Sequence, residues 1–292
     1  MVAAVPEPLI QPPAHPFSPA GVAAFATRPP WQVAAWWLAA LVAAVAVIRL
    51  AWLSTWEAAL EEASRALPPA AGAVVGGRLA WSNAAPVLTL HGGPFLGVAV
   101  CPDDPTARGR TADVQLVLHR EGFAFGSLLG TLSLPYPPAL RLPLDPVTTP
   151  GSWAGWRGPV RNAVTLAAVV ALPAGWALLT LLYTPSIWLW CRVLGREASF
   201  GACTRMTGAS LVPGALLMTG ALGLYALGGL QLEGLLLAQP AHLLPGWILC
   251  LLAPRHLPPP VAPAPETGPN PFATGPAPDD AEDNPFRAGT PD

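Results

Sequence analysis

Few side chains of this 292-residue chain could carry out chemistry, and the candidates gather between residues 54 and 159. They are two histidines and four carboxylates: His91, His119, Asp103, Asp104, Asp113 and Glu121. His119 and Glu121 are close in sequence, but neighbouring residues of a strand point to alternate faces, so the trio His119-Arg120-Glu121 does not converge. Asp103-Asp104 suits a turn better than a cation site.

The motifs that usually mark a catalytic or metal site do not occur in the sequence. It has no H-x-x-x-H pair, no nucleophile elbow and no glycine-rich phosphate loop. The sequence therefore predicts no catalytic residue, no cofactor-binding residue and no metal site. We expect a protein that is not an enzyme and that needs no cofactor.

Two charged residues lie inside apolar surroundings, where a polar group is a candidate for function. Arg49 lies about one turn inside the end of the first apolar stretch, and Glu233 opens the fourth at the same level. We predict that they approach each other; independent snorkelling into the interface is the alternative. Gln239 and His242 share a helix face opposite Glu233, which favours hydrogen bonding between helices over a proton relay.

The C-terminal tail contains a repeated motif, N-P-F-x-x-G. The first copy begins with Asn270, Pro271 and Phe272, and the second with Asn284, Pro285 and Phe286. Asn-Pro favours a turn, which would present each Phe as an apolar anchor. Two copies predict weak bivalent docking to a cytoplasmic protein partner. A tail that only solubilises the chain is the alternative.

Four long apolar stretches must position these groups, at residues 31–53, 160–184, 209–230 and 233–252. Each approaches the roughly 20 residues that a helix needs to cross a bilayer. The chain is 52% hydrophobic and only 11% charged, unlike a soluble domain. The sequence therefore predicts a membrane protein with a four-helix transmembrane bundle whose first partner is the lipid bilayer.

Arginines predict the orientation, because they favour the cytoplasmic side of short connections. Arg28 precedes the first span, residues 185–208 contain three arginines, and Arg255 follows the fourth span. This places both termini and the 185–208 loop in the cytoplasm, with residues 54–159 outside. We expect a multi-pass protein of the cytoplasmic (inner) membrane.

Residues 54–159 are predicted to form a small extracytoplasmic α+β domain. The first span continues as helix through Ser54–Leu67, with Trp56, Leu60 and Ala63 on its apolar side, until Pro68-Pro69 ends it. Short strand-like runs follow, at Ala73–Trp81, Val87–Leu90, Phe95–Cys101, Asp113–His119, Thr131–Leu134 and Leu140–Leu144. They predict an antiparallel sheet packed on the helix.

The termini and the second span complete the expected organisation. Residues 1–30 and 253–292 are rich in proline and lack periodicity, so both should be disordered cytoplasmic segments. Pro185 should break the second helix and leave Ser186–Leu194 along the inner membrane surface.

Over about residues 16–252 the layout resembles a bacterial family of membrane proteins known as domain of unknown function 1189, related to the Yip-like membrane proteins. The matching segments are Phe17-Ser18-Pro19 before the first span and, in order, Leu67-Pro68, Gly77-Arg78-Leu79, Pro86 and an apolar strand ending near Asp103. The resemblance implies the four-span fold and its location; it offers no activity to transfer. The repeat-bearing tail departs from the family pattern.

Three functions remain open at this stage. The first is a non-enzymatic scaffold or adaptor that binds through its outer domain and recruits partners through its tail. The alternative is a transporter or channel accessory subunit, and the third is a membrane-embedded enzyme. A net charge of −2 without a basic patch excludes a nucleic-acid partner.

Overall fold

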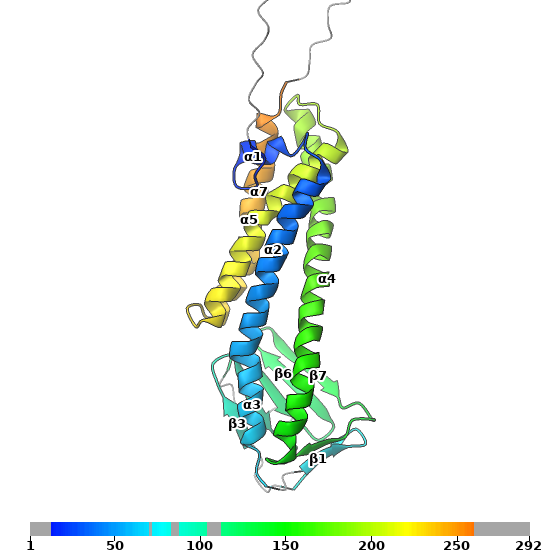
Figure 1. Cartoon of the computed structure of the whole chain (residues 1–292), viewed down its shortest axis with the longest axis vertical. Helices are drawn as coiled ribbons and strands as arrows, with labels where there is room; N and C mark the ends of the chain where they lie inside the picture. The colour runs from blue at the N-terminus through cyan, green and yellow to red at the C-terminus, as the bar shows by residue number, and fades with distance from the viewer. Residues whose placement is uncertain (1–12, 70–71, 83–87, 104–111, 260–292) are drawn as a thin grey trace, which may run out of the picture.

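The computed structural model describes residues 13–69, 72–82, 88–103 and 112–259. They form a bundle of long helices that carries a sheet domain at one end (Figure 1). We call this end the sheet end, and the opposite one, where both chain ends emerge, the terminal end. Among the described residues, four helices are long and apolar enough to cross a membrane: Pro30–Arg65, Thr148–Val193, Phe200–Ala226 and Leu232–His256.

The first long helix is one rod made of three segments. They are α2 (Pro30–Ala51), the π-helical η1 (Trp52–Glu57) and α3 (Ala58–Arg65). Pro30 begins the rod at a position where its missing N–H costs nothing. The rod confirms that the first span continues as helix into the sheet domain.

The second long helix, α4 (Thr148–Val193), is longer than the sequence predicts. It begins in the sheet domain and continues as helix through Pro159, Pro173 and Pro185. The predicted break at Pro185, the separate segment 186–194 and the loop 185–208 are therefore wrong. A proline removes one hydrogen bond of the helix, and neighbouring helices such as α5, which packs against α4, allow the helix to continue past it.

Helix α5 (Phe200–Ala226) forms the centre of the bundle and begins well before the predicted residue 209. Ser199 caps its first turn, because its Oγ accepts the N–H of Ala202 at 3.1 Å. From Met206 to Val212 every α5 residue is buried, against α2, α4 and α7.

The fourth long helix is interrupted at His242, between α6 (Leu232–Ala241) and α7 (Leu243–Leu252). At this interruption α5 comes unusually close. A Cβ on Gly214 would lie 2.1 Å from the His242 carbonyl oxygen, so only glycine allows the approach. Gly246 of α7 likewise faces the Ser210 carbonyl.

The N-terminal segment from residue 13 onward is folded, so the prediction of disorder for residues 1–30 is wrong there. It contains helix α1 (Pro19–Ala24), and both Val22 and Phe25 are fully buried. Arg205 of α5 holds the segment: its Nε donates to the Phe25 carbonyl at 3.1 Å, and its Nη2 to that of Ala26.

The start of the predicted C-terminal tail is folded as well. The 3-10 turn η2 (Ala253–His256) packs against α1, and Ala253 and Pro254 are buried. The two ends of the described chain therefore meet at the terminal end (Figure 1). The remainder of both tails, residues 1–12 and 260–292, lies outside the described residues.

The sheet domain contains two sheets. The strands are β1 (Gly72–Val75), β2 (Arg78–Trp81), β3 (Leu88–Gly92), β4 (Leu96–Val100), β5 (Val114–Leu118), β6 (Gly122–Ser127), β7 (Gly130–Pro135) and β8 (Leu142–Leu144). One sheet has the order β2-β1-β8 and the other β3-β4-β5-β6-β7. Their shared core contains Ala59 and Ala63 of α3 and Leu67 just after it, packed on Val74, Leu79, Leu96, Val98 and Val100.

The strands differ from the predicted runs in three respects. Ala73–Trp81 is a hairpin of two strands, because Gly76 and Gly77 adopt positive φ angles of 59° and 76°. Strand β6 was not predicted. The sheet is not purely antiparallel, since β4 and β5 run parallel. A parallel pair needs a long connection, and residues 101–113 provide it.

Candidate functional site

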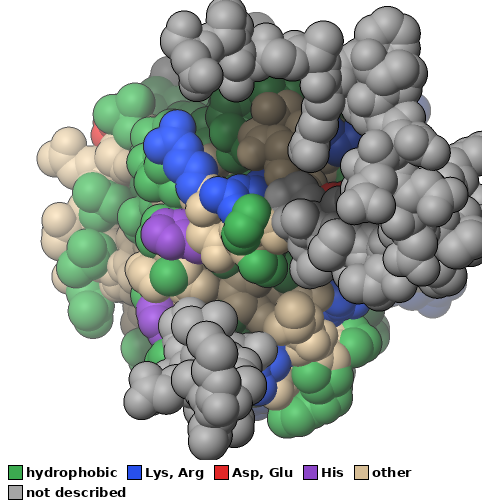
Figure 2. Space-filling model, turned by 90° about the horizontal axis from the view of Figure 1, so that it is seen from above, with side chains coloured by type: hydrophobic (Ala, Val, Ile, Leu, Met, Phe, Trp, Pro, Cys, Tyr) green, Lys and Arg blue, Asp and Glu red, His purple; other side chains and the backbone are tan. Residues whose placement is uncertain are grey.

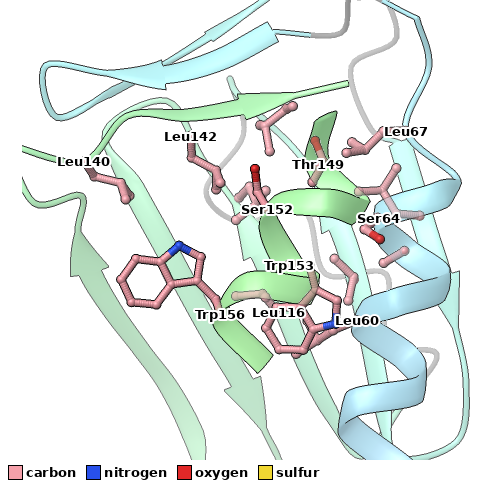
Figure 3. A pocket seen from close by; sticks show the side chains of 15 residues that line it. Leu60, Ser64, Leu67, Leu116, Leu140, Leu142, Thr149, Ser152, Trp153 and Trp156 are labelled. Atoms are coloured by element: carbon pink, nitrogen blue, oxygen red, sulfur yellow. The ribbon is translucent and has the colours of Figure 1, made fainter. Parts of the chain in front are cut away.

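A cavity of about 410 Å³ lies in the sheet domain between α3, the start of α4 and both sheets (Figure 3). Its walls are almost entirely apolar. The apolar lining residues come from α3 and a residue just after its end (Leu60, Ala63, Leu67), from α4 (Trp153, Trp156), from the larger sheet (Leu90, Val98, Leu116, Leu118) and from the β8 region (Leu140, Leu142, Leu144).

Helical periodicity explains how α3 and α4 supply their walls. Ala63 and Ser64 lie three and four residues after Leu60, so these residues occupy one face of α3, and Leu67 follows just beyond the end of the helix. On α4 the cavity-facing positions Thr149, Ser152, Trp153 and Trp156 follow the same spacing. The two tryptophans sit at the first turns of α4, and the Trp156 side chain is 64% exposed.

Two of the three hydroxyl groups of the lining, those of Thr149 and Ser64, are already bonded to the backbone. Thr149 Oγ1 donates to the Pro143 carbonyl at 2.9 Å and accepts the N–H of Asp145. Ser64 Oγ donates to the Glu61 carbonyl at 2.7 Å. The indole Nε1 of Trp153, by contrast, is buried and has no hydrogen-bond partner. The cavity thus offers apolar walls, the Ser152 hydroxyl and one buried donor without a partner.

Asp145 positions the beginning of α4. Its Oδ1 accepts the N–H groups of Val147 and Thr148, at 2.9 and 2.7 Å, and its Oδ2 accepts the Thr148 hydroxyl. These bonds, the Thr148 hydroxyl above all, lower the pKa of the Asp145 carboxyl. The ionised carboxylate therefore anchors the turn that presents Trp153 and Trp156.

An ion pair lies just beyond the cavity, where α3 and α4 continue into the bundle. Glu57, at the end of η1, is only 8% exposed, and its Oε2 lies 4.0 Å from Nη1 of Arg161 on α4. Neither Glu57 Oε2 nor Arg161 Nε has a hydrogen-bond partner. The sequence pattern does not indicate this pair, because Arg161 falls inside the second predicted span. The signal that could have indicated it is the placement of opposite charges, Glu57 after the first predicted span and Arg161 at the start of the second.

The ionisable candidates of the sequence do not form one site. His119 Nδ1 lies 3.0 Å from the Cys101 carbonyl oxygen, and Glu121 pairs with Arg78 at 3.7 Å. Asp103 pairs with Arg120, and Asp113 accepts the hydroxyl of Tyr225. No group of three His, Cys, Asp or Glu side chains suited to a metal ion occurs in the described part of the chain. Asp104 lies outside it.

His91 occupies a separate recess of about 230 Å³ between η1, α3 and the β3–β4 turn. Its Nδ1 lies 3.0 Å from Oε2 of Glu62, whose side chain is largely exposed. Ser54 lines the same recess, but its hydroxyl donates to the Leu50 carbonyl. The His91–Glu62 contact thus ties α3 to the sheet.

The predicted intramembrane pair is not brought together as an ion pair. Arg49 and Glu233 are both exposed, and no ion pair joins them. Gln239 is exposed, whereas Nδ1 of His242 is buried at the helix interruption without a hydrogen-bond partner. The candidate partner-binding residues of the tail lie outside the described residues: Asn270, Pro271, Phe272, Asn284, Pro285 and Phe286.

Comparison with other proteins leaves the family open. No protein-family model, no curated protein and no solved structure matches the chain. The resemblance to domain of unknown function 1189 therefore stays a prediction.

Proposed function

We propose that the four long helices cross the cytoplasmic membrane with the sheet domain outside and both chain ends inside. Four spans would return the two ends to one side, which agrees with the meeting of α1 and η2. Arginine and histidine side chains surround the terminal end (Figure 2). Of the described acidic residues, only Glu197 lies in the connections at this end, and such an excess of arginine favours the cytoplasmic side.

In that membrane we propose a non-enzymatic scaffold whose sheet domain takes up the acyl chain of a lipid and whose tail recruits a cytoplasmic protein. The apolar cavity carries this proposal. Its 410 Å³ falls within the roughly 300–1,000 Å³ of ligand pockets, and its walls lack a pair of acid and base groups. Because α3 and α4 lead directly from the bundle into its walls, a lipid chain can pass from the bilayer into the cavity.

Photo-crosslinking tests the uptake of an acyl chain. The full-length protein in lipid nanodiscs is illuminated with an uncharged monoacylglycerol that carries a diazirine on its chain, and the crosslinked peptides are mapped by mass spectrometry. Crosslinks to β5 and β8, which do not belong to the bundle, are expected. Crosslinks confined to α2, α4, α5 and α7 would show only the surrounding lipid and would overturn the proposal.

A pair of α4 variants provides the control. Ser152→Phe places a ring in the cavity and should abolish the β5 and β8 crosslinks, because the ring takes the space of the chain. Ala154→Phe places the same ring on the exposed face of the same helix and should leave the crosslinks unchanged.

A second candidate function, an accessory subunit of a transporter or channel, is favoured by the interrupted fourth helix. Broken helices with unpaired polar groups often line transport sites, and His242 supplies both features here. His242→Leu should impair such transport while both tails remain intact. Unchanged flux in this variant would remove the candidate.

A further inference from the structure

Two buried polar atoms without hydrogen-bond partners, Glu57 Oε2 and Arg161 Nε, lie just beyond the end of the cavity that points toward the bundle. Glu57 precedes the lining residue Leu60 by three residues, about 4.5 Å of helical rise. Arg161 follows the lining residue Trp156 by five residues, about 7.5 Å. Because α3 and α4 pack against each other, Glu57 and Arg161 approach each other beyond this end of the cavity, although neither lines it.

Glu57 and Arg161 do not satisfy each other. The 4.0 Å between Oε2 and Nη1 exceeds hydrogen-bond length. A buried polar atom without a hydrogen bond is costly, so Oε2 of the buried Glu57 and Nε of the partly exposed Arg161 are two positions that a ligand could satisfy. Trp153 Nε1, on the cavity wall, is a third atom without a partner. One carboxylate acceptor and two donors are therefore available beside an apolar chamber.

We propose that the cavity holds one chain of a phospholipid whose headgroup carries a phosphate and a primary ammonium, with the headgroup between Arg161 and Glu57. The proposal rests on the uptake of an acyl chain argued above. Arg161 and the Trp153 indole donate to phosphate oxygens, and the ammonium donates to Oε2 of Glu57.

The carboxylate is what selects this headgroup over others. A headgroup that is only anionic satisfies Arg161 but leaves the Glu57 carboxylate unpaired and repels it. A trimethylated ammonium has no N–H to donate, so it cannot form the hydrogen bond that Glu57 Oε2 lacks. The ethanolamine type of headgroup supplies both the anion and the donor.

Headgroup exchange on the unaltered full-length protein is the first test. Four diazirine lipids with identical chains are compared in nanodiscs: phosphoethanolamine, phosphocholine, phosphoglycerol and uncharged diacylglycerol. The yield of crosslinks to β5 and β8 should be highest for phosphoethanolamine, by roughly tenfold, as one charge-assisted hydrogen bond would give. Equal yields for the three phospholipids would overturn the proposal.

Single substitutions then test which residue binds the ammonium and which binds the phosphate of the headgroup. Glu57→Gln should remove the advantage of phosphoethanolamine over phosphocholine while crosslinking to the cavity persists. Arg161→Gln should lower the yield of every phosphate-bearing lipid but not of diacylglycerol. Glu61→Gln is the matched control, because Glu61 lies one turn along the same rod in a surface pair with Arg65. An equal loss of preference in Glu61→Gln would contradict the assignment.

The uncharged lipid separates this inference from the function on which it rests. If diacylglycerol reaches β5 and β8 but headgroups make no difference, the cavity binds acyl chains and the headgroup site is wrong. If no lipid reaches β5 and β8, both proposals fail.

Discussion

The hydroxyl of Tyr225, at the end of α5, donates a 2.8 Å hydrogen bond to Oδ2 of Asp113, at the start of β5. Phe95, just before β4, packs edge-on against the same tyrosine ring, with 5.1 Å between ring centroids. The parallel pair of strands is thus tied to the central helix of the bundle. Since β5 also lines the cavity, this contact connects the cavity wall to α5.

Tyr225→Phe should loosen this connection without unfolding either part. It removes the hydrogen bond but keeps the ring on Phe95, so we expect a loss of about 1 kcal/mol. Amide hydrogen exchange should rise in β4 and β5 and stay unchanged in β1 and β2. Tyr225→Ala removes both contacts and should have the larger effect; equal effects of the two variants would show that the hydrogen bond contributes nothing.

Gly214→Ala should separate α5 from the interrupted fourth helix. The added Cβ meets a backbone carbonyl 2.1 Å away, which cannot rotate aside as a side chain could. We expect a destabilisation of about 2–3 kcal/mol, measured by unfolding in detergent. Gly220→Ala, on the same helix with nothing within 4 Å of its new Cβ, should be neutral or slightly stabilising. A neutral Gly214→Ala would be inconsistent with the close approach.

Arg205→Gln should release the N-terminal segment. Because the guanidinium of Arg205 donates to the carbonyls of Phe25 and Ala26, its loss removes charge-assisted bonds worth about 1–3 kcal/mol. Limited proteolysis should then cut within residues 13–28 while the rest of the bundle resists. Arg192→Gln, which removes only a contact over the Trp188 ring, should leave the segment protected.

The start of α4 should depend on pH through Asp145. Since the pKa of Asp145 is lowered in the folded protein, its ionised form stabilises the turn above the unfolded pKa of about 3.9. This stabilisation is lost as the pH falls through the folded pKa. Hydrogen exchange in residues 147–150, corrected for intrinsic rates, should therefore accelerate below about pH 4. Asp145→Asn should flatten this dependence, and parallel pH profiles would disprove the role of the carboxylate.

Replacing both Phe272 and Phe286 by Ala should abolish capture of a cytoplasmic partner by the tail. The reason is that each N-P-F copy presents Phe as its anchor, and two copies act together through one tether. Crosslinking in the native cells, compared with the unaltered chain, should lose a discrete partner while insertion and abundance stay the same. An unchanged set of captured proteins would reduce the repeat to a spacer.

Local patterns made the long helices and most strands predictable, because composition and alternation act within one segment. Strand β6 escaped because phenylalanine alternates with glycine and alanine over Gly122–Ser127, and the preceding Glu121-Gly122 resembles a turn. The order of the N-terminal segment could not be predicted, since Phe25 and Arg205 are separated by 180 residues.

The cavity could not be predicted from local sequence patterns for the same reason. Its walls combine segments that meet only in the folded chain, such as Leu60, Leu116 and Leu142. Along β5, the sequence pattern suggests that Leu116 and Leu118 face the drier side. In the structure Gln115 and Val117 are the more buried residues, because Leu116 and Leu118 open into the cavity.

Helix α4 connects the cavity to the opposite end of the bundle through one continuous helix. From Trp153 on the cavity wall to Trp188 beside the folded N-terminal segment, it advances about 53 Å without interruption. A tilt of one degree about its sheet end displaces the other end by about 1 Å. A small rearrangement around Trp153 is therefore enlarged at the end where the two tails leave the bundle.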